Sequence, residues 1–149
     1  MMLPLNLPHY EFSVQQSTPP KIFDFIRKKY VTLTPEEWVR QNFLKFLVEE
    51  KKYPSSLIFL EQTLKVYKMQ KRCDAVVYDK KGAPQMIIEF KSPDVALTQK
   101  VFDQIARYNI TLHVNYLIVS NGLKHFCCLI NPKSSSYLFL DDIPEYSAL

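Results

Sequence analysis

Glycine is nearly absent from this chain, which has only Gly82 and Gly122 among its 149 residues. Phosphate cradles such as the P-loop and the dinucleotide-binding fingerprint need several glycines at fixed spacing, because only glycine lets the backbone approach a phosphate closely. The sequence contains neither pattern. We therefore expect no ATP binding through such a loop.

Signals for export and membrane insertion are also missing. No apolar run reaches the roughly 18 residues that indicate a transmembrane helix, and the first twelve residues have neither a basic start nor a long apolar stretch. Cys73, Cys127 and Cys128 are an odd number without CxxC spacing, which indicates reduced thiols packed in strands. We predict a cytoplasmic protein without membrane contact.

The histidines give no sign of a zinc site. His9, His113 and His125 are widely separated, and they form no spaced ligand pair with each other or with the cysteines. A serine or cysteine nucleophile has no better support, because Ser120 precedes a turn and the cysteines lie in apolar surroundings.

The composition is that of a folded protein. Hydrophobic residues make up 47% of the chain, aromatic residues 13% and charged residues 23%. This length and composition predict one domain with a substantial core, spanning residues 1–149. Within it we expect a loosely ordered N-terminal arm over residues 1–20 and a core over about residues 21–140.

Positive charge is concentrated in the first part of the chain. The net charge is +4, with +5 on residues 1–81 and −1 on residues 82–149. The basic clusters include Lys68, Lys71 and Arg72, which are candidate nucleic-acid-binding residues. A solvated lysine-rich surface is the alternative, and charge by itself favours that alternative.

Hydrophobic periodicity predicts an α/β fold with a mixed central sheet flanked by helices. A small hairpin is expected from residues 22–25 and 30–33, and helices are expected over residues 34–50 and 98–112. Strands are expected over residues 57–66, 73–78, 85–91, 116–120, 124–130 and 137–140. The helix between the strands at 85–91 and 116–120 makes a crossover, so these two strands should be parallel.

The first long helix has a clear start. Thr34 is suited to the N-cap, Pro35 to the first helical position, and Glu37 stands three residues after the cap in a capping box. In the second helix, apolar spacing runs through Val101, Phe102, Ile105, Tyr108 and Leu112. Each helix should therefore pack one face on the sheet.

Acidic and basic side chains converge in the predicted hairpin of residues 73–78 and 85–91. Alternation in a strand places Glu89 and Lys91 on one face, and antiparallel pairing brings Asp74 near them. Two neighbouring carboxylates repel each other unless a cation lies between them, so the pair is suited to Mg²⁺. An ordinary salt bridge is the alternative, and an isolated ExK triplet favours it.

These residues occur in an order that resembles the PD-(D/E)xK nuclease superfamily. The ordered elements are Glu36 or Glu37, Asp74, Glu89-Phe90-Lys91, and Gln104 with Tyr108. The segments TPEEWVRQ, KRCDAVVYD, IIEFKSP, FDQIARYN and YLIVSNG resemble the N-terminal nuclease domain of type I restriction enzyme R subunits. The resemblance covers about residues 21–130. Cys73 stands where the motif has proline, and no motor or specificity region is present.

The resemblance implies a restriction-endonuclease-like core that hydrolyses phosphodiester bonds in DNA with Mg²⁺, for which Mn²⁺ could substitute. It implies metal ligands in Asp74, Glu89 and the backbone carbonyl of Phe90. It also implies that Lys91 activates the water and that a helix glutamate steers the metal through water. Gln104 and Tyr108 would lie near the active site.

Several alternatives remain open at this point. Glu37 already has a capping role, which makes Glu36 the better site candidate, although Glu36 could simply pair with Arg40 on the helix surface. Without the family pattern, Tyr108 would belong to the core stripe and Gln104 to the surface. The chain could also be a catalytically inactive module that binds DNA or another protein. The substrate, DNA or RNA, is not fixed, nor is whether a homodimer or a partner protein is needed.

Overall fold

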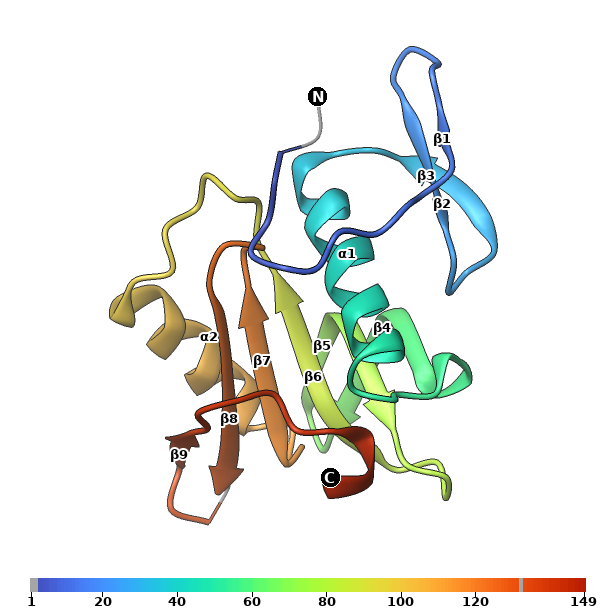
Figure 1. Ribbon diagram of the computed structural model, residues 1–149. Coiled ribbons are helices and arrows are strands. Elements are labelled where there is room, and N and C mark those ends of the chain that lie inside the picture. Colours follow the sequence, from blue (N-terminus) through green and yellow to red (C-terminus); the bar gives the residue numbers. More distant parts are fainter. Residues whose placement is uncertain (1–2, 132) are drawn as a thin grey trace.

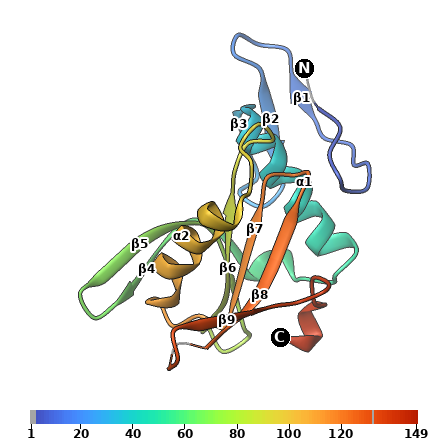
Figure 2. The same cartoon turned by 90° about the vertical axis from the view of Figure 1, so that its left-hand side faces the viewer.

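The computed structural model describes residues 3–131 and 133–149, and within these ranges it contains two β-sheets and two α-helices. A small antiparallel sheet has the order β1-β2-β3, and a mixed sheet has the order β4-β5-β6-β7-β8-β9. Figure 1 shows helices α1 and α2 beside the large sheet, and the view in Figure 2 separates them to its two sides. The predicted fold class, a mixed sheet flanked by helices, is confirmed.

The elements have the following bounds. The small sheet consists of β1 (Val14–Gln15), β2 (Lys21–Asp24) and β3 (Lys29–Thr32), and the helices are α1 (Pro35–Glu49) and α2 (Gln99–Ile110). The large sheet consists of β4 (Ile58–Val66), β5 (Met69–Tyr78), β6 (Pro84–Phe90), β7 (Tyr116–Ser120), β8 (His125–Asn131) and β9 (Ser136–Phe139). Short 3-10 turns occupy Ser55–Leu57 and Tyr146–Ala148.

Strand pairing agrees with the sequence prediction at the centre of the sheet. β6 and β7 are parallel, with Glu89 opposite Val119, and the other neighbours in this sheet are antiparallel. The crossover through α2 accounts for the one parallel pair. The predicted hairpin at residues 22–33 is confirmed as β2 and β3, whereas the short strand β1 was not predicted.

Helix α1 begins as predicted. The backbone N–H of Glu37 donates to Thr34 Oγ1 at 3.0 Å, and Pro35 occupies the first turn. The carboxylate of Glu37 is used differently from the capping-box prediction, because it accepts hydrogen bonds from Arg40 and Gln41 on the same helix. The buried face of α1 packs on the sheet through Val39, Phe43, Leu44 and Leu47.

The strands β4 and β5 change faces partway along their length. Ile58 and Leu60 belong to the core under α1, whereas Leu64 and Val66 pack on the core under α2. Even-numbered residues of a regular strand would all face one side. Glu61 lies between the two groups with a φ of +53°, and this left-handed residue reverses the alternation. The outer half of the hairpin is therefore turned relative to its base.

The N-terminal segment makes defined contacts with the core of the fold. The Asn6 N–H donates to Gly122 O at 2.8 Å, and the Trp38 indole N–H donates to Leu3 O at 2.8 Å. Gly122 has a φ of +85°, and a Cβ placed there would lie 2.7 Å from Leu5 Cδ2. Glycine at this position therefore permits both the turn and the close approach of the segment.

The three cysteines are buried free thiols in β5 and β8, as the sequence predicts. Burial raises the pKa of Cys73 to about 11, so this thiol is protonated and unreactive at neutral pH. Among the described residues, no helix has both the length and the apolar character needed to cross a membrane.

Candidate nuclease site

The site begins where β5 and β6 separate. Backbone pairing of these strands ends at Ala75 and Ile88. One residue further, the Asp74 carboxylate accepts a hydrogen bond from the Phe90 N–H, with 2.7 Å between Oδ2 and N. A side chain thus replaces a backbone acceptor at this point. The hairpin brings Asp74 to residues 89–91, as the sequence predicts.

Glu89 is a buried carboxyl group with an elevated pKa. Its relative exposure is 8%. Burial and then the charge of Asp74 raise its pKa to about 7, although Lys71 acts in the opposite direction. A buried carboxyl group whose ionisation a neighbouring carboxylate disfavours is characteristic of a site suited to a cation.

Lys71 joins this site from the adjoining strand β5. Its ammonium group forms an ion pair with Glu89, and its Nζ lies 5.7 Å from the centre of the Tyr108 ring. Sequence analysis placed Lys71 among residues that would bind nucleic acid. The structure places it on the α2 side of the sheet, against a carboxylate of the site itself.

Tyr108 and Gln104 lie on the exposed part of helix α2. Tyr108 is 45% exposed, so the alternative that it belongs to the core stripe is wrong. Its hydroxyl donates to Gln70 O at 3.3 Å, and its ring adjoins Lys71. Gln104 is exposed one turn earlier, and within the described part of the chain no hydrogen bond links it to Asp74 or Glu89.

Glu36 and Lys91 flank the acidic pair. The pKa of Glu36 is raised, first by burial and next by Asp74, whereas the charges of Lys91 and Arg40 lower it. Lys91 follows β6 directly, and its N–H donates to Ser120 O at 2.9 Å. Glu36 therefore shares an electrostatic environment with Asp74 and Lys91, whereas the carboxylate of Glu37 is held by hydrogen bonds in a neighbouring network.

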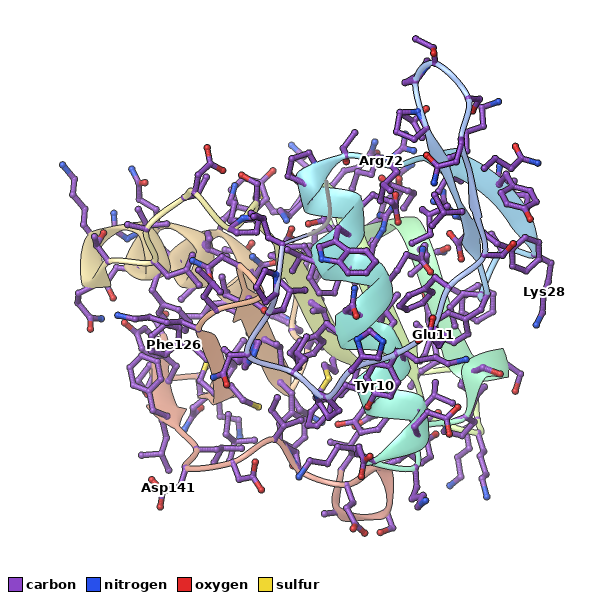
Figure 3. All side chains as sticks on the ribbon, turned by 45° about the horizontal axis from the view of Figure 1, so that its top comes forward. Tyr10, Glu11, Lys28, Arg72, Phe126 and Asp141 are labelled. Atoms are coloured by element: carbon purple, nitrogen blue, oxygen red, sulfur yellow. The ribbon has the colours of Figure 1, made fainter. Side chains whose placement is uncertain are left out.

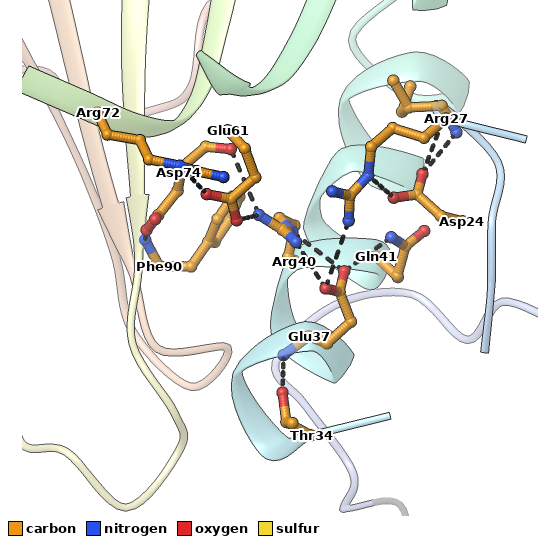
Figure 4. A network of polar contacts seen from close by, with 11 residues as sticks. Asp24, Arg27, Thr34, Glu37, Arg40, Gln41, Glu61, Arg72, Asp74 and Phe90 are labelled. Carbon is orange, nitrogen blue, oxygen red and sulfur yellow. Dashed lines mark hydrogen bonds and ion pairs between the residues drawn. The ribbon is translucent and has the colours of Figure 1, made fainter. Parts of the chain in front are cut away.

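That network is a row of alternating charges, shown in Figure 4. It is centred on Arg40, which binds Glu37 at 2.6 Å and Glu61 at 2.7 Å. Arg40 also lies 3.5 Å from the carbonyl oxygen of Asp74. Arg72 continues the row to Glu61 at 3.0 Å. Arg27, bound to Asp24, lies at the other end, 3.8 Å from Glu37.

The network corrects the predicted partner of Arg40, and it adds Arg40 and Glu61 to the residues around the site. Arg40 pairs with Glu37 rather than with Glu36, and it is buried rather than at the surface. Burial alone would raise the pKa of Glu61, but Arg40 and Arg72 lower it below its usual value. The i, i+3 spacing of Glu37 and Arg40 was a usable signal for this pair. No local signal indicates Glu61, because its role depends on a left-handed backbone conformation.

The remaining candidate residues have different surroundings. Lys68 lies in the exposed turn between β4 and β5, whereas Arg72 is held by Glu61. Of the three predicted nucleic-acid-binding residues, Lys68 alone is at the tip of the hairpin. Lys71 and Arg72 face opposite sides of β5.

The donor atoms fit a hard divalent cation. Mg²⁺ takes oxygen ligands and is typically bound through one or two carboxylates, with water completing its shell. Asp74, Glu89 and the carbonyl of Phe90 provide such a set at the end of one hairpin. Across residues 3–131 and 133–149, no group of three or more His, Cys, Asp or Glu side chains is arranged to hold a metal.

Comparison with known proteins identifies the family. A family model described as type I restriction enzyme R protein N terminus matches residues 35–144, and the chain belongs to this family. No curated protein matches the chain. The family confirms the resemblance found in the sequence.

Two solved structures match the chain. A DrdV–DNA complex determined by cryo-electron microscopy has 18% identity and a TM-score of 0.47, covering 73% of this chain and 11% of that one. The chain thus spans about a tenth of that protein's length. A crystal structure of a DUF820 protein from Anabaena variabilis has 14% identity and a TM-score of 0.47, covering 89% of this chain and 85% of that one.

Proposed function

We propose that the protein is an endonuclease that hydrolyses phosphodiester bonds in DNA with Mg²⁺. The observation that carries this proposal is the meeting of Asp74 and Glu89 where β5 and β6 separate, with the Asp74 carboxylate bound to the Phe90 N–H. Membership in the restriction enzyme R N-terminal family supports a nuclease-like function for this site.

The residues of the site have distinct roles in this proposal. Asp74, Glu89 and the carbonyl of Phe90 would hold the cation, and Glu36 would orient water beside it. A bound Mg²⁺ supplies a Lewis acid for the phosphoryl oxygen and lowers the pKa of a bound water. Mn²⁺ has similar ligand preferences and would replace it.

Lys91 acts on the attacking water and on the phosphate. Its ammonium group orients the water and offsets negative charge as it develops on the phosphoryl group. The water oxygen forms a bond to phosphorus and gives up a proton to solvent, the bond from phosphorus to the leaving oxygen breaks, and the leaving oxygen takes up a proton from solvent. Tyr108 and Gln104 border the site on α2, and Tyr108 orients Lys71 through its ring.

The test is a plasmid-nicking assay combined with calorimetric titration of Mg²⁺ and Mn²⁺. Asp74→Asn removes one negative charge but keeps an oxygen that can accept from the Phe90 N–H. We expect it to abolish nicking and metal binding without unfolding the protein. The matched control is Asp141→Asn, at an exposed position that lies well away from Arg72 in Figure 3. Nicking by Asp74→Asn at the wild-type rate would refute the proposal.

A second function has one observation in its favour, the ion pair between Lys71 and Glu89. Because Lys71 is part of the protein and neutralises Glu89, no metal ion is needed to balance this carboxylate, as expected for a site that stabilises the fold without catalysing a reaction. In that case the protein would be a DNA-binding or protein-binding module on the same fold. DNA binding without specific metal binding or nicking in the wild type would support this alternative.

A further inference from the structure

The β4–β5 hairpin extends past the body of the large sheet, as Figure 2 shows. We call its outer half, residues 62–73, the arm. The arm contains four basic residues and no acidic ones. The arm has two faces, as any strand pair does. Glu61 turns both faces relative to the base of the hairpin. One face carries Lys71 and packs toward α2, and the other carries Lys65 and Arg72.

Two of the four basic residues remain available to a partner. Lys71 and Arg72 are bound by Glu89 and Glu61. Lys65 and Lys68 are exposed, and within the described ranges neither forms an ion pair. The outermost part of the arm is therefore its most positive part, which favours a polyanionic partner.

Tyr67 at the tip is 96% exposed and has a φ of +55°. It is the first central residue of a two-residue turn, with Val66 paired to Met69. Glycine or asparagine is usual where such a turn needs positive φ, and a bulky residue there is an outlier. Packing inside the protein does not account for the aromatic ring, because the ring is almost wholly in solvent. An aromatic residue in this position is suited to contact with a ligand outside the chain.

We propose that the arm inserts into a groove of duplex DNA, with Lys65 and Lys68 on the phosphates and Tyr67 against the base edges. The major groove admits a two-stranded β-ribbon and presents apolar thymine methyl groups to such a side chain. Counting from Lys68 to Asp74 along β5 at about 3.3 Å per residue, the tip lies about 20 Å from the acidic site. This inference rests on the proposed function, because it assigns the arm to hold the DNA that the site would cut.

The experiment measures binding of a fluorescent 30-base-pair duplex in EDTA, by anisotropy, over a series of KCl concentrations. In the variant Lys65→Gln/Lys68→Gln, two phosphate contacts are lost. We expect the slope of log K against log[KCl] to become shallower by about 1.8, because each contact contributes about 0.9. The control Lys80→Gln/Lys81→Gln removes the same charge from the turn at the other end of β5, and its slope should match that of the wild type.

Tyr67→Gly separates a binding role from a structural one. Glycine adopts positive φ without strain, so the melting temperature of this variant should equal or exceed that of the wild type. We expect its duplex affinity to fall at least fivefold with an unchanged salt slope. Unchanged affinity would overturn the role of Tyr67 in the proposal.

Two further results would overturn the arm proposal as a whole. One is equal loss of affinity in the Lys80→Gln/Lys81→Gln control, and the other is failure of the wild type to bind the duplex. Because the assay contains no divalent metal, it is independent of cleavage. Arm variants that bind weakly in a protein that never nicks plasmid would support the arm and refute the nuclease. If the arm variants bind the duplex with wild-type affinity and the protein nicks plasmid, the arm proposal is refuted and the nuclease proposal is supported.

Discussion

Asp74 accepts the hydrogen bond of the Phe90 N–H at the point where the ladder between β5 and β6 stops. Burial raises the pKa of Glu89, and the charge of this same carboxylate raises it further. One side chain thus closes the hairpin and contributes to the charge state of the site. The stability lost on substituting Asp74 depends on whether the new side chain removes the hydrogen bond, the charge or both.

We predict that Asp74→Ala is less stable than Asp74→Asn by about 1–2 kcal/mol. Alanine leaves the Phe90 N–H without its acceptor, whereas the amide oxygen of asparagine can still accept from it. Urea unfolding of the two variants in chelator measures the difference. Equal stabilities would mean that the bond between Asp74 and Phe90 contributes nothing to folding.

The ionisation of Glu89 makes stability depend on pH. A carboxyl group whose pKa rises from 4.5 unfolded to about 7 folded favours the folded state fully below pH 4.5, and this contribution is lost as pH rises to about 7. We predict that the unfolding free energy of the wild type falls relative to that of Glu89→Gln by up to about 3 kcal/mol between pH 4.5 and 7.5. Parallel urea titrations across this range, without metal, test the prediction, and parallel pH profiles would contradict it.

Arg40 is expected to be the most important residue of the charge network for stability. Arg40→Met leaves Glu37 buried without its bidentate partner, and we predict a loss of about 3 kcal/mol. Arg72→Met provides the matched control, because its side chain is 69% exposed and binds the same Glu61. It should cost less than about 1 kcal/mol. Thermal unfolding of both variants gives the comparison, and similar costs would rule out a special role for Arg40.

Gly122 and Gly82 form a natural pair for testing how the N-terminal segment is held. Both have positive φ, but a Cβ at Gly82 meets nothing within 4 Å, whereas one at Gly122 meets Leu5. Both alanine variants should lose about 1–2 kcal/mol to backbone strain. Only Gly122→Ala should also displace the segment from the Trp38 indole, which bonds to Leu3. A shift in tryptophan fluorescence in that variant alone is the expected result, and identical spectra for the two variants would contradict it.

The sequence predicted the elements that depend on local patterns. The Thr34 cap, the hairpin around Gly82 and the crossover between β6 and β7 all follow from capping, turn chemistry and periodicity. The convergence of Asp74 with residues 89–91 follows in turn from the hairpin. These parts of the site could be placed because each rests on a short stretch of chain.

The parts that the sequence missed depend on distant contacts or on unusual backbone geometry. The start of β5 at Met69 lay in a charged stretch that favours a loop, and its charges are balanced by Glu89 and Glu61 from other strands. The left-handed conformation of Glu61 has no signal in residue type. Tyr108 matched the helical stripe by spacing, yet it lies at the open edge beside Lys71.

The reversal of faces at Glu61 restricts how the arm could change length. Side chains alternate along a strand, so one residue added to β5 between Arg72 and Asp74 would exchange the faces of Lys71 and Arg72. Glu89 and Glu61 would each lose their present partner. Relatives should therefore keep the spacing from these two side chains to Asp74, or change it by an even number of residues. A graft of this arm onto another nuclease core would have to keep the same parity.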